Sequence, residues 1–215
     1  MLRNSPFYCI IDKETCARTP LADVANKITN KGCGIFQYRD KVSNKETVLK
    51  NARTLKKSFD GNCLFIVNDF LDVAKIIDCD GVHFGQGDLS LKLARQFLGP
   101  NKIIGISCHS LKQAIDAQNC GADYISIGPI FPTPTKPEYK SVGLGLIKAV
   151  GKKIKIPFFA IGGINRNNLN SVLSSGAKRV AICSAVCQAK DITATVKNIS
   201  EAISYGAVSE HNLFG

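Results

Sequence analysis

The chain has 215 residues, 45% of them hydrophobic, which is enough for one substantial core and predicts one domain. No apolar run approaches the roughly 18–20 residues of a membrane span, and residues 1–4 lead directly into a strand-like run rather than into a signal peptide. The net charge of +11 comes from lysines spread over helix-like segments, without the dense basic block of a nucleic-acid-binding surface. Such a charge instead favours small polyanions as ligands.

The nine cysteines are odd in number, and none forms a C-x-x-C pair. Most of them, such as Cys9, Cys63 and Cys183, lie in apolar runs, where a reduced thiol behaves as a small hydrophobe. This distribution favours a reduced, cytoplasmic protein over a disulfide framework.

Along the chain, a short β-rich run followed by an amphipathic helical stretch recurs eight times. The strand-like runs are residues 7–12, 35–40, 63–68, 81–84, 102–107, 124–129, 158–163 and 179–184. Apolar residues with helical spacing occur in residues 45–59, 111–120, 144–150 and 192–205. Glycines typical of helix C-termini follow several helical stretches: Gly32, Gly61, Gly99, Gly121, Gly176 and Gly206.

Eight consecutive β–α units with short connections predict an α/β fold, a closed (β/α)8 TIM barrel formed as a single domain by residues 1–215. Its core is expected to cover residues 7–205, followed by a frayed, polar tail of residues 206–215 that shows no periodic pattern. The alternative is a doubly wound sheet, but the glycine-rich fingerprint that such folds usually carry after the first strand is missing. A barrel further predicts that chemistry lies at the carboxyl ends of the strands.

The loop of residues 128–136, after the sixth predicted strand, is the most informative stretch of the chain. Its three prolines fix the backbone angle φ at three positions. The hydroxyls of Thr133 and Thr135 and the ammonium group of Lys136 are therefore presented with little conformational freedom left to lose. Rigid donors of this kind suit a phosphorylated ligand.

Polar residues also follow most of the other predicted strands. Gln37, Arg39 and Lys41 alternate along an extended segment, so their side chains point the same way, and two cations with an amide suit a diphosphate. Asp69 and Asp88 follow successive strands, and two carboxylates on a basic rim predict a Mg²⁺ site that phosphates would complete. Ion pairs of these carboxylates with Arg39 or Lys41 are the alternative.

Backbone N–H groups complete the predicted rim. After the seventh and eighth strands, Gly163 and the pair Cys183 and Ser184 can present N–H groups at close range, which is the usual phosphate site of a barrel. The rim is therefore expected to bind two anionic groups, one of them together with a metal ion.

Two histidines and two cysteines invite other interpretations. His83 lies within a strand and is predicted to pack inside the barrel rather than to bind a metal, whereas His109 either contacts substrate or caps the helix that follows it. Cys108 and Cys183 lack a nearby histidine–carboxylate signature for nucleophilic catalysis, so we interpret both as small neutral residues.

Ordered motifs between about residues 7 and 190 resemble those of the thiamine phosphate synthase family. They are Gln37-x-Arg39-x-Lys41, Asn68-Asp69, Gly81-Val82-His83-x-Gly85-Gln86-x-Asp88, Gly105-x-Ser107-x-His109, Gly121-Ala122-Asp123-Tyr124, Gly128-Pro129-Ile130-Phe131-Pro132-Thr133-x-Thr135-Lys136 and Ile161-Gly162-Gly163-Ile164. The resemblance implies a Mg²⁺-dependent transferase that joins a hydroxymethylpyrimidine diphosphate to a thiazole phosphate, by way of a pyrimidine cation, and releases pyrophosphate. Whether the thiazole is carboxylated stays open.

The same resemblance implies roles for individual residues. The pyrimidine diphosphate would be held by Gln37, Tyr38, Arg39, Asp40, Lys41, Asn68, Ser107 and Lys136, of which Arg39, Lys41, Ser107 and Lys136 form the catalytic set. The thiazole phosphate would be held by Thr133, Pro134, Thr135, Gly163, Cys183 and Ser184, and Mg²⁺ by Asp69 and Asp88. Cys183 departs from the family, which more often has an aliphatic residue there, but backbone contacts would survive that change.

Two other functions fit the same barrel. A thiazole tautomerase of this fold handles the thiazole phosphate without joining it to anything, and tends to lack the complete diphosphate and metal residues found here. A non-catalytic sensor would bind phosphorylated ligands without turnover, although two facing anion sites and two carboxylates argue against it. The expected partners are phosphorylated small molecules, with no nucleic acid or membrane, and a homo-oligomer is left open.

Overall fold

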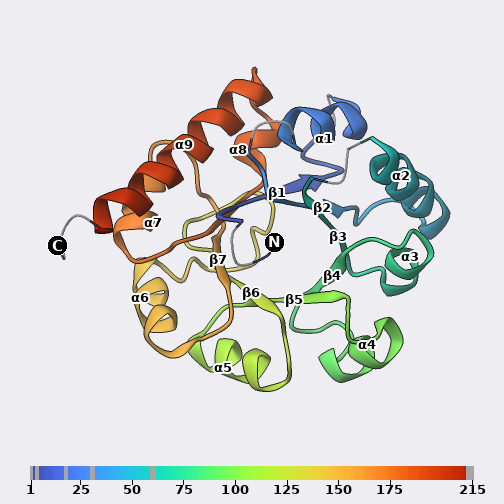
Figure 1. Ribbon diagram of the computed structural model, residues 1–215, viewed down its shortest axis with the longest axis horizontal. Coiled ribbons are helices and arrows are strands. Elements are labelled where there is room, and N and C mark those ends of the chain that lie inside the picture. Colours follow the sequence, from blue (N-terminus) through green and yellow to red (C-terminus); the bar gives the residue numbers. More distant parts are fainter. Residues whose placement is uncertain (1, 3–4, 17–18, 30–31, 59–61, 212–215) are drawn as a thin grey trace.

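The computed structural model, which describes residues 2, 5–16, 19–29, 32–58 and 62–211, is a closed barrel of eight parallel strands (Figure 1). The strands are β1 (Phe7–Asp12), β2 (Ile35–Arg39), β3 (Leu64–Asn68), β4 (Gly81–Phe84), β5 (Ile103–Cys108), β6 (Tyr124–Ile127), β7 (Phe158–Ile161) and β8 (Val180–Ile182). Each strand pairs with its neighbours in sequence, and β8 pairs with β1 to close the sheet. The predicted (β/α)8 barrel is confirmed, and the doubly wound alternative is excluded because an open sheet would leave its edge strands unpaired.

Helices follow the strands and form the outer ring of the molecule in Figure 1. They are α1 (Leu21–Thr29), α2 (Lys45–Lys57), α3 (Leu71–Ile76), α4 (Leu91–Leu98), α5 (Leu111–Asn119), α6 (Leu144–Lys153), α7 (Leu169–Ser174), α8 (Ser184–Cys187) and α9 (Ile192–His211). Asn44, Ser90 and Ser110 cap α2, α4 and α5, because each side chain accepts a hydrogen bond from the backbone N–H three residues later. Among the described residues, none of the helices is long and apolar enough to cross a membrane.

The last part of the chain differs from the prediction. Helix α9 continues through Gly206 to His211, so Gly206 does not end a helix, and residues 206–211 are not an irregular tail. A glycine inside a helix costs only about 1 kcal/mol relative to alanine, and α9 is a long helix that packs on α1, α7 and α8. The short α8 also escaped prediction, because four residues are too few to show a helical period. Phe59, Gly61 and residues 212–215 lie outside the described residues.

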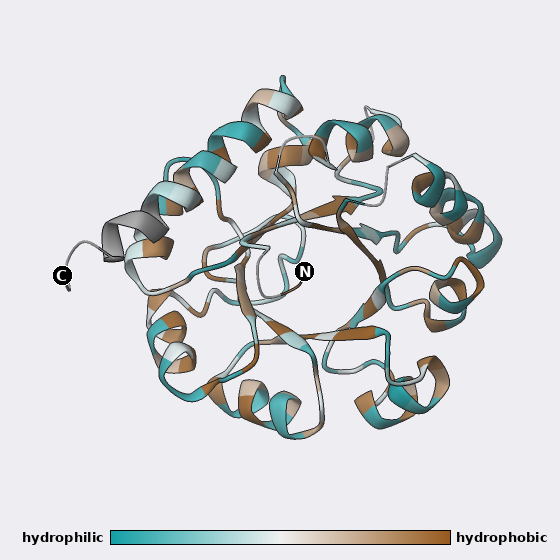
Figure 2. Cartoon of the chain, viewed as in Figure 1, coloured by the Kyte–Doolittle hydropathy of each residue, from teal (hydrophilic) through white to brown (hydrophobic). Residues whose placement is uncertain are grey.

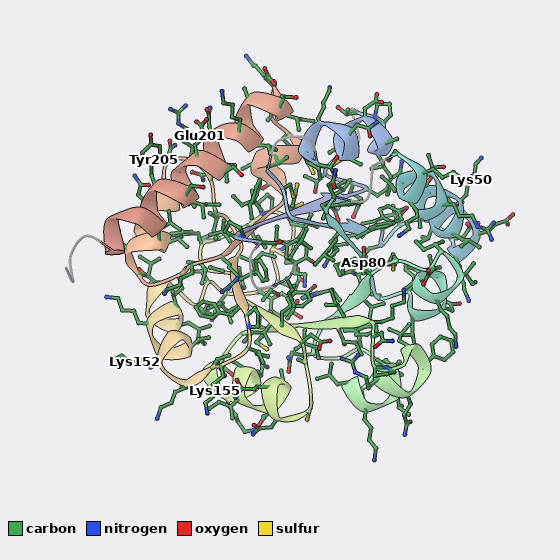
Figure 3. All side chains as sticks on the ribbon, viewed as in Figure 1. Lys50, Asp80, Lys152, Lys155, Glu201 and Tyr205 are labelled. Atoms are coloured by element: carbon green, nitrogen blue, oxygen red, sulfur yellow. The ribbon has the colours of Figure 1, made fainter. Side chains whose placement is uncertain are left out.

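Polarity divides the molecule into an apolar interior and a charged outer surface. Hydrophobic residues concentrate on the strands and on the helix faces that cover them, and hydrophilic residues cover the outside of the helices (Figure 2). Lys50, Lys152 and Lys155 project outward from this ring and are exposed (Figure 3). Positive charge at these positions is therefore solvated and does not belong to the barrel rim.

The alternation of side chains along the strands splits the core into two layers. Outward-facing residues pack under the helices, as where the rings of Phe36 and Phe65 stack with centroids 4.6 Å apart. Inward-facing residues form a second buried cluster, in which Tyr8, Tyr124 and Phe159 meet with ring centroids 5.2–5.9 Å apart. This cluster fills the barrel below the rim, so the interior is a packed core and not a pore.

Tyr124 fits inside the barrel because its neighbour on β5 is a glycine. A Cβ atom added at Gly105 would lie 2.1 Å from Cζ and 2.5 Å from the hydroxyl oxygen of Tyr124. Any side chain at this position would therefore displace the Tyr124 ring.

We expect Gly105→Ala to destabilise the protein by about 1–3 kcal/mol, because the added methyl group overpacks the barrel interior. Gly151→Ala is a matched control in α6, where nothing lies within 4 Å of an added Cβ. This control should raise the free energy of unfolding by up to about 1 kcal/mol through helix propensity. Urea denaturation measures both changes, and effects of equal sign would contradict the packing argument.

Candidate active site at the carboxyl end of the barrel

A cavity of about 770 Å³, open space at its mouth included, lies at the carboxyl ends of the strands. The residues that line it include many of those predicted from the sequence: Gln37, Arg39, Asn68, Ser107, Thr133, Thr135, Lys136, Gly163, Cys183 and Ser184. They come from β2, β3 and β5 and from the loops after β6, β7 and β8, so barrel closure brings together residues far apart in the sequence.

Tyr38 and Asp40, also predicted to bind substrate, do not line this cavity. Tyr38 alternates with Gln37 and Arg39, so its side chain packs in the outer core layer. Its hydroxyl donates to Oδ2 of Asp40 at 2.8 Å, and Oδ1 of Asp40 accepts from the backbone N–H of Ser43 at 2.9 Å. Both residues thus shape the turn after β2 that carries Lys41. Pro134 belongs to the outer surface of the 128–136 loop.

Arg39 is held in the cavity wall by a buried carboxylate that the sequence analysis left without a role. Its guanidinium Nη1 donates to Oδ2 of Asp12, which is 2% exposed. The other oxygen of Asp12 accepts from the backbone N–H of Thr15 at 2.9 Å and from its hydroxyl at 2.7 Å. The pairing of β1 with β2 brings the two residues together, because Asp12 and Arg39 are partners in its register.

Lys41 and Asp69 form an ion pair beside the cavity. The predicted alternative of ion pairing is therefore correct for Asp69 with Lys41, whereas Arg39 pairs with Asp12 instead. The paired oxygen of Asp69 is Oδ2, which is buried. Its backbone has a φ of 62°, in the left-handed region that non-glycine residues rarely adopt. Such local strain persists where the surrounding structure imposes it, and it is found disproportionately at functional sites.

A second carboxylate, Asp88, lies close enough to Asp69 to affect its ionisation. Burial raises the pKa of Asp69, Lys41 opposes this, and the charge of Asp88 raises it further. Oδ2 of Asp88 accepts from the backbone N–H of Gly85 at 2.6 Å. Across the described ranges, no group of three or more His, Cys, Asp or Glu side chains is arranged to hold a metal ion. Two carboxylates fit Mg²⁺, which commonly binds one or two carboxylates together with substrate phosphates and water.

Lys136 is a half-buried cation that makes no ion pair with any carboxylate of the described residues. Burial lowers its pKa, and the nearby charges of Arg39 and Lys41 lower it further. Its Nζ atom lies 5.5 Å from the ring centroid of Tyr139, whose ring stacks on His109 at 4.4 Å. Cations that lie close together in a cavity favour the binding of a multiply charged anion there.

His109 lines the cavity, but it does not cap the following helix, because Ser110 is the N-cap of α5. Its Nδ1 atom lies 2.5 Å from the carbonyl oxygen of Gly128. Of its two predicted roles, capping is therefore wrong, and contact with a ligand stays a prediction.

The loop after β6 is tied to the end of β7 by backbone hydrogen bonds. The N–H groups of Ile130 and Phe131 donate to the carbonyls of Ile161 and Gly162 at 2.8 and 3.0 Å. Gly163 has a φ of 64°, and a Cβ there would lie 2.5 Å from the carbonyl oxygen of Pro132. Pro132 therefore lies against Gly163, and Thr133, Thr135, Gly163 and Ser184 at the start of α8 all line the cavity.

His83 is packed inside the barrel, as predicted, and is 5% exposed. Burial lowers its pKa to about 3, and the charge of Lys136 acts in the same direction. Its ring nitrogens contact the hydroxyls of Tyr124 and Ser107 at 2.9 and 3.0 Å. The sequence analysis missed this polar cluster because hydroxyls of tyrosine residues in apolar runs carry no pattern of their own.

Comparison with known proteins identifies the family of the chain. The thiamine monophosphate synthase family matches residues 7–186. The chain belongs to this family. It is 41% identical over 198 residues to the thiamine-phosphate synthase of Shouchella clausii, which covers 91% of this chain and 95% of that protein. It is 38% identical to that of Methanosarcina mazei, over 94% and 85% of the two chains.

Solved structures give the same result. The thiamine phosphate pyrophosphorylase of Pyrococcus furiosus superposes with a TM-score of 0.87 at 32% identity, over 96% of this chain and 99% of that one. Membership in the thiamine monophosphate synthase family makes the chain a transferase of thiamine biosynthesis.

The contribution of Asp40 to the stability of the protein is expected to depend on pH. Burial raises the pKa of Asp40, but hydrogen bonds from Ser43, Tyr38 and Val42 outweigh this and bring it below its usual 3.8. Because the folded pKa is the lower one, this stabilisation is complete above the unfolded pKa and is lost as the pH falls through the folded pKa. Asp40→Asn should therefore cost about 1–2 kcal/mol near neutral pH.

That cost should shrink once the pH falls below 3.8, the usual pKa of the carboxyl group. Urea denaturation of both proteins over a pH series measures the difference. A difference that stays constant into the acid range would show that the charge of Asp40 does not stabilise the turn.

Proposed function

We propose that the protein condenses 4-amino-2-methyl-5-(diphosphooxymethyl)pyrimidine with 4-methyl-5-(2-phosphoethyl)thiazole to form thiamine phosphate and pyrophosphate. The single observation that carries this proposal is the Lys136 ammonium, which pairs with no carboxylate of the described residues and lines the cavity with Arg39, with Lys41 nearby. Three cations around one cavity support a diphosphate ligand, since phosphates are commonly bound by clustered arginine and lysine side chains. Whether the thiazole carries a carboxyl group does not affect this argument.

The proposed reaction needs no activated nucleophile. The bond between the pyrimidine methylene carbon and the diphosphate oxygen breaks, and the diphosphate leaves with the electron pair. The lone pair of the thiazole nitrogen then forms the new carbon–nitrogen bond to the pyrimidine cation. The chemical task of the protein is to stabilise the charge that develops on the departing diphosphate, which Arg39, Lys41 and Lys136 can do from fixed positions.

Asp69 and Asp88 would hold Mg²⁺ in the proposed complex. The buried Oδ2 atom of Asp69 and the proximity of the two carboxylates support this assignment. A bound Mg²⁺ ion would neutralise part of the diphosphate charge. Lys41, which pairs with Asp69, would then be available to the diphosphate.

The other side of the cavity suits the thiazole phosphate. The hydroxyls of Thr133 and Thr135, the backbone of Gly163 and the Cys183–Ser184 segment can donate to a phosphate. The second substrate would then share the cavity with the pyrimidine diphosphate, so that the thiazole nitrogen can approach the pyrimidine methylene carbon. A cytoplasmic location is part of the proposal and is supported by the nine scattered cysteines.

Purified protein mixed with both substrates should form thiamine phosphate and pyrophosphate in equal amounts, and only when Mg²⁺ is present. Separate assays for the two products measure this. Binding of the thiazole phosphate without product would favour a tautomerase, and binding of both substrates without product a sensor. Product formation that is unchanged by a chelator would overturn the metal assignment.

Lys136→Ala should lower turnover by about 10²–10³, because removal of one preorganised charge-stabilising group typically has an effect of this size. Lys140→Ala is a matched control: it removes an exposed lysine of the same loop that does not line the cavity. Steady-state kinetics and circular dichroism of both variants test the assignment. Unchanged turnover in folded Lys136→Ala protein would remove Lys136 from the proposed mechanism.

A further inference from the structure

A chain of hydrogen bonds runs beneath the cavity from one lining residue to another. Nε2 of Gln37 donates to the hydroxyl of Tyr8 at 2.8 Å, and the hydroxyls of Tyr8 and Tyr124 lie 2.8 Å apart. The Tyr124 hydroxyl contacts Nδ1 of His83, and Nε2 of His83 contacts Oγ of Ser107. Gln37 and Ser107 line the cavity, and the residues between them are at most 5% exposed.

The number of hydrogens in this chain is limited. Each hydroxyl has one hydrogen to donate, and a neutral imidazole carries one N–H. His83 is neutral in this setting, because it is buried and its hydrogen-bond partners are hydroxyls and not carboxylates. Every contact must therefore have one donor and one acceptor, and the direction of one contact constrains the next.

Gln37 sets the direction of the whole chain. An amide nitrogen donates and does not accept, so Tyr8 accepts from Gln37 and must use its own hydrogen for Tyr124. Tyr124 then donates to Nδ1 of His83, and the ring N–H is left on Nε2, facing Ser107. In the opposite direction, the Tyr8 hydrogen would be buried without an acceptor among the described residues, which native structures rarely tolerate.

Ser107 ends the chain with its own hydrogen unused. Its Oγ accepts from Nε2 of His83, and the hydroxyl of Ser126 also donates to it at 3.3 Å. At the other end, the amide oxygen of Gln37 has no partner among the described residues. One end of the chain therefore offers a donor to the cavity, and the other end an acceptor.

We propose that this hydrogen-bond chain fixes the donor and acceptor pattern that selects the substrate ring, with Tyr8, Tyr124 and His83 as positioning residues. The proposal rests on the proposed function, because a 4-aminopyrimidine carries an N–H donor next to a ring-nitrogen acceptor. The amide oxygen of Gln37 accepts from the amine, and the Ser107 hydroxyl donates to a ring nitrogen. A 4-oxopyrimidine has the inverse pattern and would be rejected.

Nitrogen-15 NMR of histidine-labelled protein tests the direction without any substrate. The chain has three histidines, so His83 can be assigned by substitution. We expect His83 to be protonated at Nε2 and not at Nδ1. Tyr124→Phe should abolish this fixed tautomer, whereas Tyr38→Phe, which removes a buried hydroxyl bonded to Asp40 and Asn51, should leave it unchanged. Protonation of His83 at Nδ1 in the unsubstituted protein would overturn the proposal.

Kinetics test the consequence for recognition. Tyr8→Phe and Tyr124→Phe should raise the KM for the aminopyrimidine diphosphate by about tenfold, with a smaller change in kcat, because ring recognition acts before and during the reaction. They should also reduce discrimination against the 4-oxo analogue. Two variants are used so that the test still works if one of them does not fold. An unchanged KM in a folded variant would overturn the positioning role of the substituted tyrosine.

The condensation reaction and the direction of the hydrogen-bond chain can be contradicted independently of each other. His83 protonated at Nε2 in a protein that forms no thiamine phosphate would support the hydrogen-bond chain and overturn the condensation. Product formation with His83 protonated at Nδ1 would support the condensation and overturn the direction of the chain.

Discussion

The pairing of β8 with β1 is the constraint on which the rest of the structure depends, because it turns a row of strand ends into a ring. Residues that follow different strands then face one cavity, and Arg39 on β2 and Ser184 after β8 both line it. Closure also removes the sheet edges, because every strand pairs with a neighbour on both sides. Inside the ring, the inward-facing aromatic residues fill the lower barrel and leave only the rim open to ligands.

Charge at the rim is arranged for a ligand rather than for stability of the free protein. Asp12 neutralises Arg39 and Asp69 neutralises Lys41, but Lys136 stays among cations with no carboxylate of the described residues paired to it. Asp69 combines a left-handed backbone with a buried carboxylate oxygen. A partly buried cation without a carboxylate partner lowers stability, and a bound anion would offset that cost. Natural proteins commonly tolerate such costs at functional sites.

Local rules predicted much of the rim, and their failures have physical reasons. Polar residues after predicted strands proved to line the cavity, as Gln37, Asn68 and Thr133 do. Tyr38 was assigned to substrate along with its neighbours, although the alternation of strand side chains sends it to the opposite face. The hydrogen-bond chain through Tyr8 and Tyr124 could not be foreseen, because it joins side chains 116 residues apart.

The sequence by itself determined the eight β–α units, the strand ends that carry chemistry and the residue types suited to phosphates and Mg²⁺. These follow from short-range periodicity and from motifs in which the reacting groups lie within a few residues of one another. Only the tertiary structure decided that Asp12 holds Arg39, that Lys136 is left without a carboxylate, and how His83 connects Tyr124 to Ser107. Those outcomes depend on which side chains meet across the closed barrel, and a linear pattern carries no information about contacts between distant strands.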